Sequence, residues 1–282
     1  MDLNFVMLHM AQRLRPGSGR GGVGGRRSLT RWERVYSGGM AKFTREEILA
    51  KVAARESLEG ADLSGVELEW PTDLSGANLE EANLAGAHLS KAFLTGANLS
   101  GADLRGAHLC YSWVEERSLL VSANLSGANL HGADLRYAKL SGADLSGANL
   151  TGADLRAADF SKAHLMEANL RGAILSEANL RGADLRGADL RRADLRGAIL
   201  SGANLHSANL VAASLVGANL SGAELTYVDL SRVNLTGADL SEADLSEAFS
   251  WTKADLRGAK YTSKTMWPDY FDPEAAGVVL VD

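Results

Sequence analysis

Leucine recurs at every fifth position through most of the second half of the chain, as in SGADLSGANLTGADL at residues 141–155. The period does not break from Leu125 to Leu245, and Phe160 is the one centre in this run that is not Leu. Ala stands two residues before each centre except where Val228 and Val233 replace it, and most other positions are polar. Neither an α-helix nor a flat strand places every fifth residue on one face.

The pattern instead requires a chain that bends between successive units, so that every central residue points to a shared axis and neighbouring turns stack through backbone hydrogen bonds. The sequence therefore predicts an all-β solenoid. Gly stands two residues after many centres, which suits corners with positive φ, although Tyr137 and Lys162 occupy the same position. Periodicity alone leaves open whether three or four units complete one coil. The predicted interior includes Leu125, Leu145, Phe160, Leu185, Leu205, Leu225 and Leu245.

The tandem A(D/N)LxG units resemble those of the pentapeptide-repeat family over residues 58–261. The resemblance implies a right-handed quadrilateral β-helix with four units in each coil. About ten coils spaced by about 4.8 Å would give a rod of roughly 48 Å. The resemblance also implies that the Leu centres and the Ala residues before them face inward. Burial of each Leu would then contribute about 1.5–3 kcal/mol relative to exposure.

The segments before the repeats differ from them in composition. Residues 1–39 are rich in Gly and Arg, carry a net charge of +5 and show no periodic apolar face, which is typical of a disordered leader. An Arg-rich leader also suits a transit peptide or a nucleic-acid-binding arm, and Met40 is an alternative start. Residues 40–57 predict a short helix that caps the first coil, and Thr44 and Glu47 fit a capping box.

The last segment, residues 262–282, abandons the period and introduces aromatic residues. It resembles a C-terminal extension found on many members of the family, and we predict that it forms the second cap. Some relatives dimerise through this end. The apolar run from Val278 to Val281 is therefore a candidate homodimer interface as well as a candidate for packing within the cap.

The period slips by one residue at three places, Leu68 to Leu74, Val114 to Leu120 and Leu245 to Leu256, and a Trp lies near each. Insertions in solenoids often gather on one binding face, and aromatic and charged side chains are common at interfaces. The alternative for the middle slip is a tolerated β-bulge whose Trp covers a gap. The interaction candidates are Trp70, Tyr111, Trp113, Glu115, Glu116, Arg117 and Trp251.

A metal site is a further hypothesis. If the coils stack with one residue added at the middle slip, His88 lies on His108 and Cys110 lies on His131. Imidazole nitrogen and thiolate sulfur are ligands that zinc accepts. The alternative is an exposed polar ladder in which His replaces the usual Asn. The single Cys excludes an intramolecular disulfide and is compatible with a reducing compartment.

Charge is unevenly distributed around the predicted solenoid, within a formal net charge of −6 for the chain. An acidic side of the solenoid would matter for function, because the resemblance implies a class of partner: some family members present an acidic surface shaped like DNA and bind type II topoisomerases. Duplex DNA of about 48 Å carries about 28 charges, which is far more than this side offers. When the unit of Leu58 is counted as the first of four sides, the second side is the most acidic. Its acidic residues are Asp62, Asp103, Asp144, Glu167, Asp184, Glu224, Asp244 and Glu247.

A basic girdle encircles the middle of the predicted rod and lacks aromatic partners, so we expect no direct binding of nucleic acid by the rod. Much of the girdle can pair with Asp184, Asp189 and Asp194 in a solvated surface network. The girdle consists of Arg171, Arg181, Arg186, Arg191, Arg192 and Arg196.

A filled rod predicts no cleft from which water is excluded, so the sequence predicts neither an enzyme nor a cofactor site. No apolar run approaches the ~18 residues that suggest a membrane span, and we expect a cytoplasmic protein unless the leader is a transit peptide. The resulting prediction is a non-catalytic interaction or structural scaffold with an unknown protein partner. The alternative is a DNA-mimicking modulator of a type II topoisomerase such as gyrase.

Overall fold

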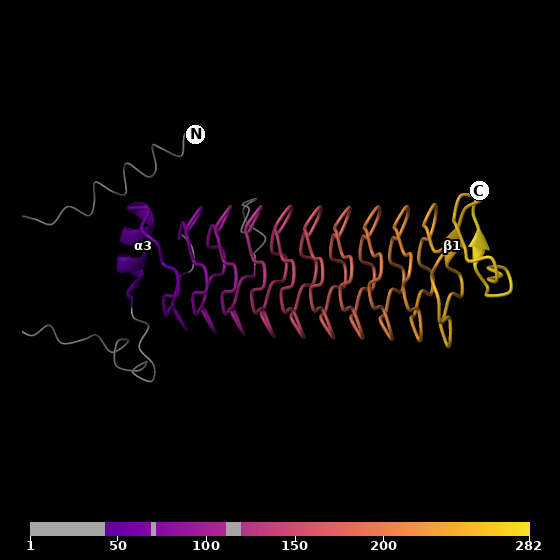
Figure 1. The fold of residues 1–282 in the computed structure, drawn as a ribbon, viewed down its shortest axis with the longest axis horizontal. Coiled ribbons are helices and arrows are strands. Elements are labelled where there is room, and N and C mark those ends of the chain that lie inside the picture. Colours follow the sequence, from indigo (N-terminus) through magenta and orange to yellow (C-terminus); the bar gives the residue numbers. More distant parts are fainter. Residues whose placement is uncertain (1–42, 69–71, 111–119) are drawn as a thin grey trace, which may run out of the picture. The chain divides into compact units, whose positions relative to one another are not determined.

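A computed structural model describes residues 43–68, 72–110 and 120–282, all of which belong to one compact unit, Ala41–Asp282. In these residues the chain winds into a stack of short coils (Figure 1). Helix α3, Arg45–Ala53, lies at one end of the stack. The strands β1, Lys260–Tyr261, and β2, Val279–Leu280, lie at the other end and pair in parallel.

Backbone hydrogen bonds join each coil to the next. The amide of Leu145 donates to the carbonyl of His164 at 2.7 Å, and the amide of Asp144 donates to the carbonyl of Ala123 at 2.9 Å. Parallel partners such as Asn149 and Asn169 are twenty residues apart, so four five-residue units complete one coil. The question that periodicity left open is thereby answered, and the period of five corresponds to one side of a four-sided coil.

The bridging residues form four ladders along the stack, which define the faces A to D. Face A contains Asn78, Asn98, Asn124, Asp144, His164, Asp184, Asn204, Glu224, Asp244 and Met266. Face B contains Asp62, Asn83, Asp103, Asn129, Asn149, Asn169, Asp189, Asn209, Asp229 and Phe249. Face C contains Glu67, His88, His108, Asp134, Asp154, Ile174, Asp194, Ser214, Asn234 and Asp255. Face D contains Asp73 and Phe93, and then Lys139, Asp159, Asn179, Ile199, Asn219, Asp239 and Lys260.

The register corrects one expectation from the sequence. Asn98 pairs with Asn124 and His108 pairs with Asp134, so partners across this junction are 26 residues apart. The chain between Leu109 and Leu120 therefore contains six residues more than the coil needs, and not one. Val114 fits the five-residue spacing after Leu109, which is why the sequence suggested a single extra residue. The other two slips do add one residue, as in the pairs Glu67 with His88 and Asn234 with Asp255.

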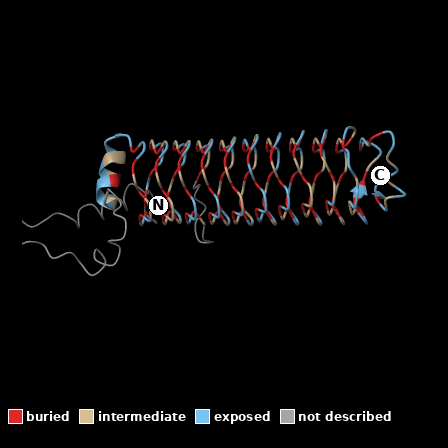
Figure 2. Ribbon diagram, turned by 60° about the horizontal axis from the view of Figure 1, so that its bottom comes forward, coloured by how far each residue is buried: buried red, intermediate tan, exposed pale blue. Residues whose placement is uncertain are grey.

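The interior contains the predicted residues. Every Leu of the predicted interior set is at most 1% exposed, and Phe160 is fully buried. Figure 2 shows the buried positions as a regular inner series along the stack, with intermediate and exposed positions between them. Ala residues two positions before each centre are also buried, because two large side chains per unit would not fit inside a coil of twenty residues.

The corners are β-turns in which the third residue has positive φ. The amide of Ala148 donates to the carbonyl of Leu145 at 3.0 Å, and Gly147 between them has a φ of 66°. Gly adopts this conformation without a steric penalty, whereas a side chain at the same position is strained. Tyr137 and Tyr227 nevertheless occupy such corners, with φ values of 60° and 57°.

Helix α3 covers the first coil. The side chain of Thr44 accepts the amide of Glu47, and the Glu47 carboxylate accepts the amide of Thr44, so the predicted capping box is present. Ile48 is fully buried within the core, and Phe43 and Val52 pack against the core. Burial of this helix face shields the first coil from water.

The C-terminal cap is aromatic. Phe271 stacks on Trp251, with ring centroids 4.1 Å apart, and on Trp267, with centroids 5.0 Å apart. Tyr261 meets Trp267 edge to face at 5.8 Å. Strand β2 then adds to β1, so that Val279 extends the ladder of face D beyond Lys260. Val278 is buried, whereas the three residues that follow it are about half exposed.

Candidate functional site

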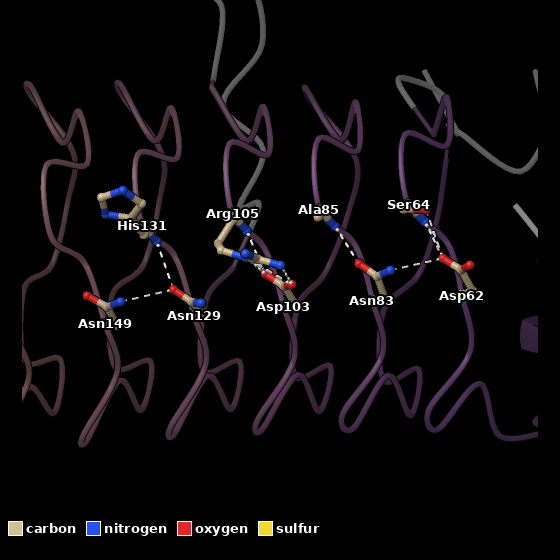
Figure 3. Close-up of polar contacts among 9 residues, drawn as sticks. All are labelled: Asp62, Ser64, Asn83, Ala85, Asp103, Arg105, Asn129, His131 and Asn149. Carbon is tan, nitrogen blue, oxygen red and sulfur yellow. Dashed lines mark hydrogen bonds and ion pairs between the residues drawn. The ribbon is translucent and has the colours of Figure 1, made fainter. Parts of the chain in front are cut away.

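The outer surface consists of polar side chains that largely satisfy one another, as face B shows (Figure 3). Asn83 donates its side-chain amide to the Asp62 carboxylate at 3.1 Å, and its own oxygen accepts the amide of Ala85 at 3.2 Å. Asn149 donates to Asn129 at 3.1 Å in the same way. Asp and Asn suit these positions because a short side-chain oxygen reaches the amide two residues later.

Ion pairs between an Asp of a ladder and the Arg two residues after it occur in many coils. Arg186 donates from Nη2 to Asp184 at 2.7 Å, and Arg196 donates to Asp194 at 2.6 Å. The hydrogen bond from Arg186 lowers the pKa of Asp184, and Arg257 lowers the pKa of Asp255 to about 2. The pairing of the basic girdle with Asp184, Asp189 and Asp194 is confirmed. Each pair is exposed on its Arg side, so it contributes little to stability.

The four residues of the predicted metal cluster do not meet. His88 and His108 stack on face C with ring centroids 4.8 Å apart. Cys110 follows them on that face, and its sulfur lies 3.4 Å from the Ser90 hydroxyl. His131 lies on face B, where its amide donates to Asn129 (Figure 3), so the expected stacking of Cys110 on His131 is wrong. The six-residue junction moves His131 to another face. Within the described ranges, no three His, Cys, Asp or Glu residues are grouped to hold a metal ion.

A model of pentapeptide repeats matches eight copies, in residues 72–109, 117–152, 148–187, 163–202, 173–210 and 213–249. The chain belongs to the pentapeptide-repeat family. A comparison of this pentapeptide-repeat protein with curated proteins finds no match.

Solved structures of other pentapeptide-repeat proteins are similar to it. HetL, involved in heterocyst differentiation regulation in the cyanobacterium Nostoc sp. strain PCC 7120, is 36% identical, with 80% of this chain and 94% of HetL covered and a TM-score of 0.53. A protein of the Arabidopsis thaliana thylakoid lumen is 42% identical over 36% of this chain and 66% of its own, with a TM-score of 0.28. QnrB1, a plasmid-mediated fluoroquinolone resistance protein, is 21% identical over 64% of this chain and 90% of its own, with a TM-score of 0.36.

Most of the predicted interaction candidates lie outside the described residues: Trp70, Tyr111, Trp113, Glu115, Glu116 and Arg117. Trp251 is described, and its ring is partly buried in the C-terminal cap against Phe271. Its indole nitrogen is buried and lacks a hydrogen-bond partner within the described structure, as does that of Trp267. Trp251 therefore serves the packing of the cap rather than presenting a free aromatic surface.

The acidic side is reorganised by the same six-residue junction. Asp62 and Asp103 lie on face B, not with the other acidic residues, so the predicted composition of this side is wrong in part. Face A and the corner that follows it hold most of the acidic set, and Arg186 is paired there with Asp184. The acidic residues along this side are Glu59, Glu80, Glu81, Asp144, Glu167, Asp184, Glu224, Asp244 and Glu247.

The sequence reasoning missed a group of exposed apolar side chains near the C-terminal end of the stack. Tyr227 is 54% exposed, Phe249 43%, Met266 50% and Tyr270 70%. Two signals were available, namely an aromatic residue at a Gly corner and apolar residues at ladder positions that are usually Asn or Asp.

In the described part of the protein, the helix present is too short to cross a bilayer.

Proposed function

We propose that this pentapeptide-repeat protein is a non-catalytic scaffold that binds a protein partner along its outer surface. The observation that carries the proposal is the contrast between a surface of largely self-satisfied polar ladders and the exposed aromatic and apolar side chains that gather near the C-terminal end of the stack. Ladders such as the one in Figure 3 leave few free polar groups for chemistry, whereas exposed apolar groups mark interaction sites.

A shallow hollow of about 580 Å³ beside α3 does not suggest catalysis. Its lining contains Arg55, Glu56, Ser57, Ser75 and Asn78, and the Glu56 carboxylate pairs with Lys51 at 2.7 Å. The serines of this lining have no His beside them, and the one carboxylate of the lining, Glu56, is held by Lys51. HetL, similar over most of its length, is described as involved in regulation, which suits a scaffold that acts by binding. We place the scaffold in the cytoplasm.

Affinity purification with the full chain as bait tests the scaffold proposal, with each recovered protein purified and its binding measured again by calorimetry. We expect at least one stoichiometric partner and no turnover of it. Recovery of no protein that binds in the purified system would reject the proposal.

The second candidate function is modulation of a type II topoisomerase, and the acidity of face A favours it. A gyrase supercoiling assay titrated with the full chain tests this function. We expect inhibition, and a weaker effect after Asp144→Asn, Glu224→Gln and Asp244→Asn on face A. The matched control replaces Asp73, Asp159 and Asp239 on face D with Asn. No effect at large excess, or equal loss in both triple variants, would reject this candidate.

We also propose that two copies associate through the C-terminal end. Val279, Leu280 and Val281 are about half exposed, and β2 is the last strand of the stack, with one edge not covered by β1. Exposed apolar strand edges favour pairing with another chain. Sedimentation velocity should show a dimer that Leu280→Asp dissociates, and a monomer at all concentrations would contradict the proposal.

A further inference from the structure

Four exposed apolar side chains come from coils that stack directly on one another near the C-terminal end. Phe249 pairs with Asp229 of the preceding coil, and Asp229 lies two residues after Tyr227 in the sequence. Met266 pairs with Asp244 on face A. Tyr270 returns to the same corner, where its hydroxyl donates to the carbonyl of Ala248 at 2.8 Å. We name Tyr227, Phe249, Met266 and Tyr270 the aromatic edge, because they follow the corner between faces A and B.

The two tyrosines of the aromatic edge are fixed in position although their rings are exposed. The hydroxyl of Tyr270 is anchored to the backbone, while 70% of the residue is open to solvent. The ring of Tyr227 meets His206 edge to face at 5.4 Å. Tyr227 also has positive φ, where Gly would be unstrained, so the backbone conformation does not account for a Tyr at this position. Fixed aromatic rings lose little entropy on binding, which is typical of interface anchors.

On face A and the corner that follows it, the part of the surface that carries Tyr227, Met266 and Tyr270 has negative charges only; Arg232 and Lys253 lie at the other end of face B, and Lys264 is paired with Glu242. The segments of face A and its corner in this region are residues 204–207, 224–227, 244–247 and 266–270. They contain no Lys or Arg. Their acidic residues are Glu224, Asp244, Glu247 and Asp269.

A guanidinium group is complementary to this surface in two ways. It stacks on aromatic rings, and it binds carboxylates through two parallel hydrogen bonds. The apolar rings and Met266 offer contact area for the side chains between such cations. We propose that the aromatic edge docks an extended segment of a partner protein in which Arg residues alternate with apolar residues. This inference rests on the proposed scaffold function and names the chemistry of its partner.

A second copy of the chain is a poor occupant. Symmetric pairing of two aromatic edges would bring Glu224, Asp244 and Glu247 of one copy near the same carboxylates of the other. Like charges facing each other across an interface are unfavourable. The charge pattern therefore favours a cationic partner over self-association at this edge.

The test measures binding of a fluorescein-labelled synthetic peptide of alternating Arg and Leu by anisotropy, with the full chain. The decisive variant is Tyr227→Gly, and its matched control is Tyr137→Gly on another corner of the stack. Both residues have positive φ, so Gly fits both sites without strain and neither variant should lower the melting temperature. We expect Tyr227→Gly, and independently Tyr270→Ala, to weaken binding about tenfold or more. Tyr137→Gly should bind as the parent protein does, and added salt should weaken binding.

Several results would overturn the inference. These are absence of peptide binding, equal binding of a peptide with Glu in place of Arg, or equal loss in Tyr137→Gly. Sedimentation velocity that showed a dimer dissociated by Tyr227→Gly would assign the edge to a second copy instead. Affinity purification with Tyr227→Gly as the bait distinguishes failure of the docking site from failure of the proposed scaffold function. Undiminished recovery of a verified partner by Tyr227→Gly would reject the docking site alone, whereas no partner for either bait would reject the scaffold function.

Discussion

Replacing Leu185 with Ala tests whether the interior of the stack is as tightly packed as its burial indicates. Leu185 is fully buried on face A, and backbone hydrogen bonds hold its coil on both sides, from Leu165 to Asp184 and from Leu185 to Asn204, each at 2.7 Å. These bonds prevent the coil from collapsing into the space that the variant leaves. We therefore expect the full cost of a buried cavity.

The magnitude follows from the atoms removed. Loss of three carbons costs about 2–3 kcal/mol in transfer free energy. The unrelaxed cavity raises the expected destabilisation to about 3–5 kcal/mol. The matched control is Ile199→Ala, a ladder residue that is 41% exposed, for which we expect about 0.5–1 kcal/mol.

Urea unfolding followed by circular dichroism measures both variants. Because stacked repeats need not unfold in a single step, hydrogen exchange should accompany it and show whether protection is lost mainly in the coils next to Leu185. Equal destabilisation by Leu185→Ala and Ile199→Ala, or a cost below about 1 kcal/mol for the former, would refute the view of a rigid interior.

Three further substitutions test the corners, the ion pairs and the cap. Gly147→Ala should destabilise by about 1 kcal/mol through its positive φ alone, since no atom lies within 4 Å of the added methyl group; an unchanged urea midpoint would contradict this. The pKa of Asp184 is lowered by Arg186, so this pair stabilises the fold above the unfolded pKa of about 3.9 and loses its effect as the pH falls through the folded value. Arg186→Gln should therefore reduce the acid dependence of the melting temperature below about pH 4, and an identical dependence would exclude the pair as a contributor. Thr44→Ala should destabilise α3 by about 1 kcal/mol, seen as faster hydrogen exchange in the helix with the central coils unchanged, and uniform acceleration would show that the helix is not a separate cap.

Much of the fold could be predicted because the signals are local and repeated. The Leu centres, the small Ala partners and the corner positions recur at fixed spacing, and the capping box at Thr44 and Glu47 is visible within four residues. What each unit buries is decided within that unit. The sequence alone therefore identified the interior correctly.

The positions of side chains relative to one another on the surface were predicted less well, because they depend on the accumulated count along the chain. Val114 has the correct spacing from Leu109, and nothing local indicates that the coil resumes only at Leu120. The count from there on was wrong by one face, which misplaced His131. The aromatic edge was missed for a related reason, since Tyr270 reaches Ala248, in the coil after that of Tyr227, only when the C-terminal segment folds back on the last coils.

The regular pairing of residues twenty apart constrains how a gene for this protein can change. A duplication of twenty residues would add a coil and leave every later side chain on its original face. A duplication of five would move all later side chains to the next face. Side chains before and after the duplicated segment that now share a face would then lie on different faces. The six extra residues between Leu109 and Leu120 leave the pairing intact on both sides, so this junction shows where length can vary without either consequence.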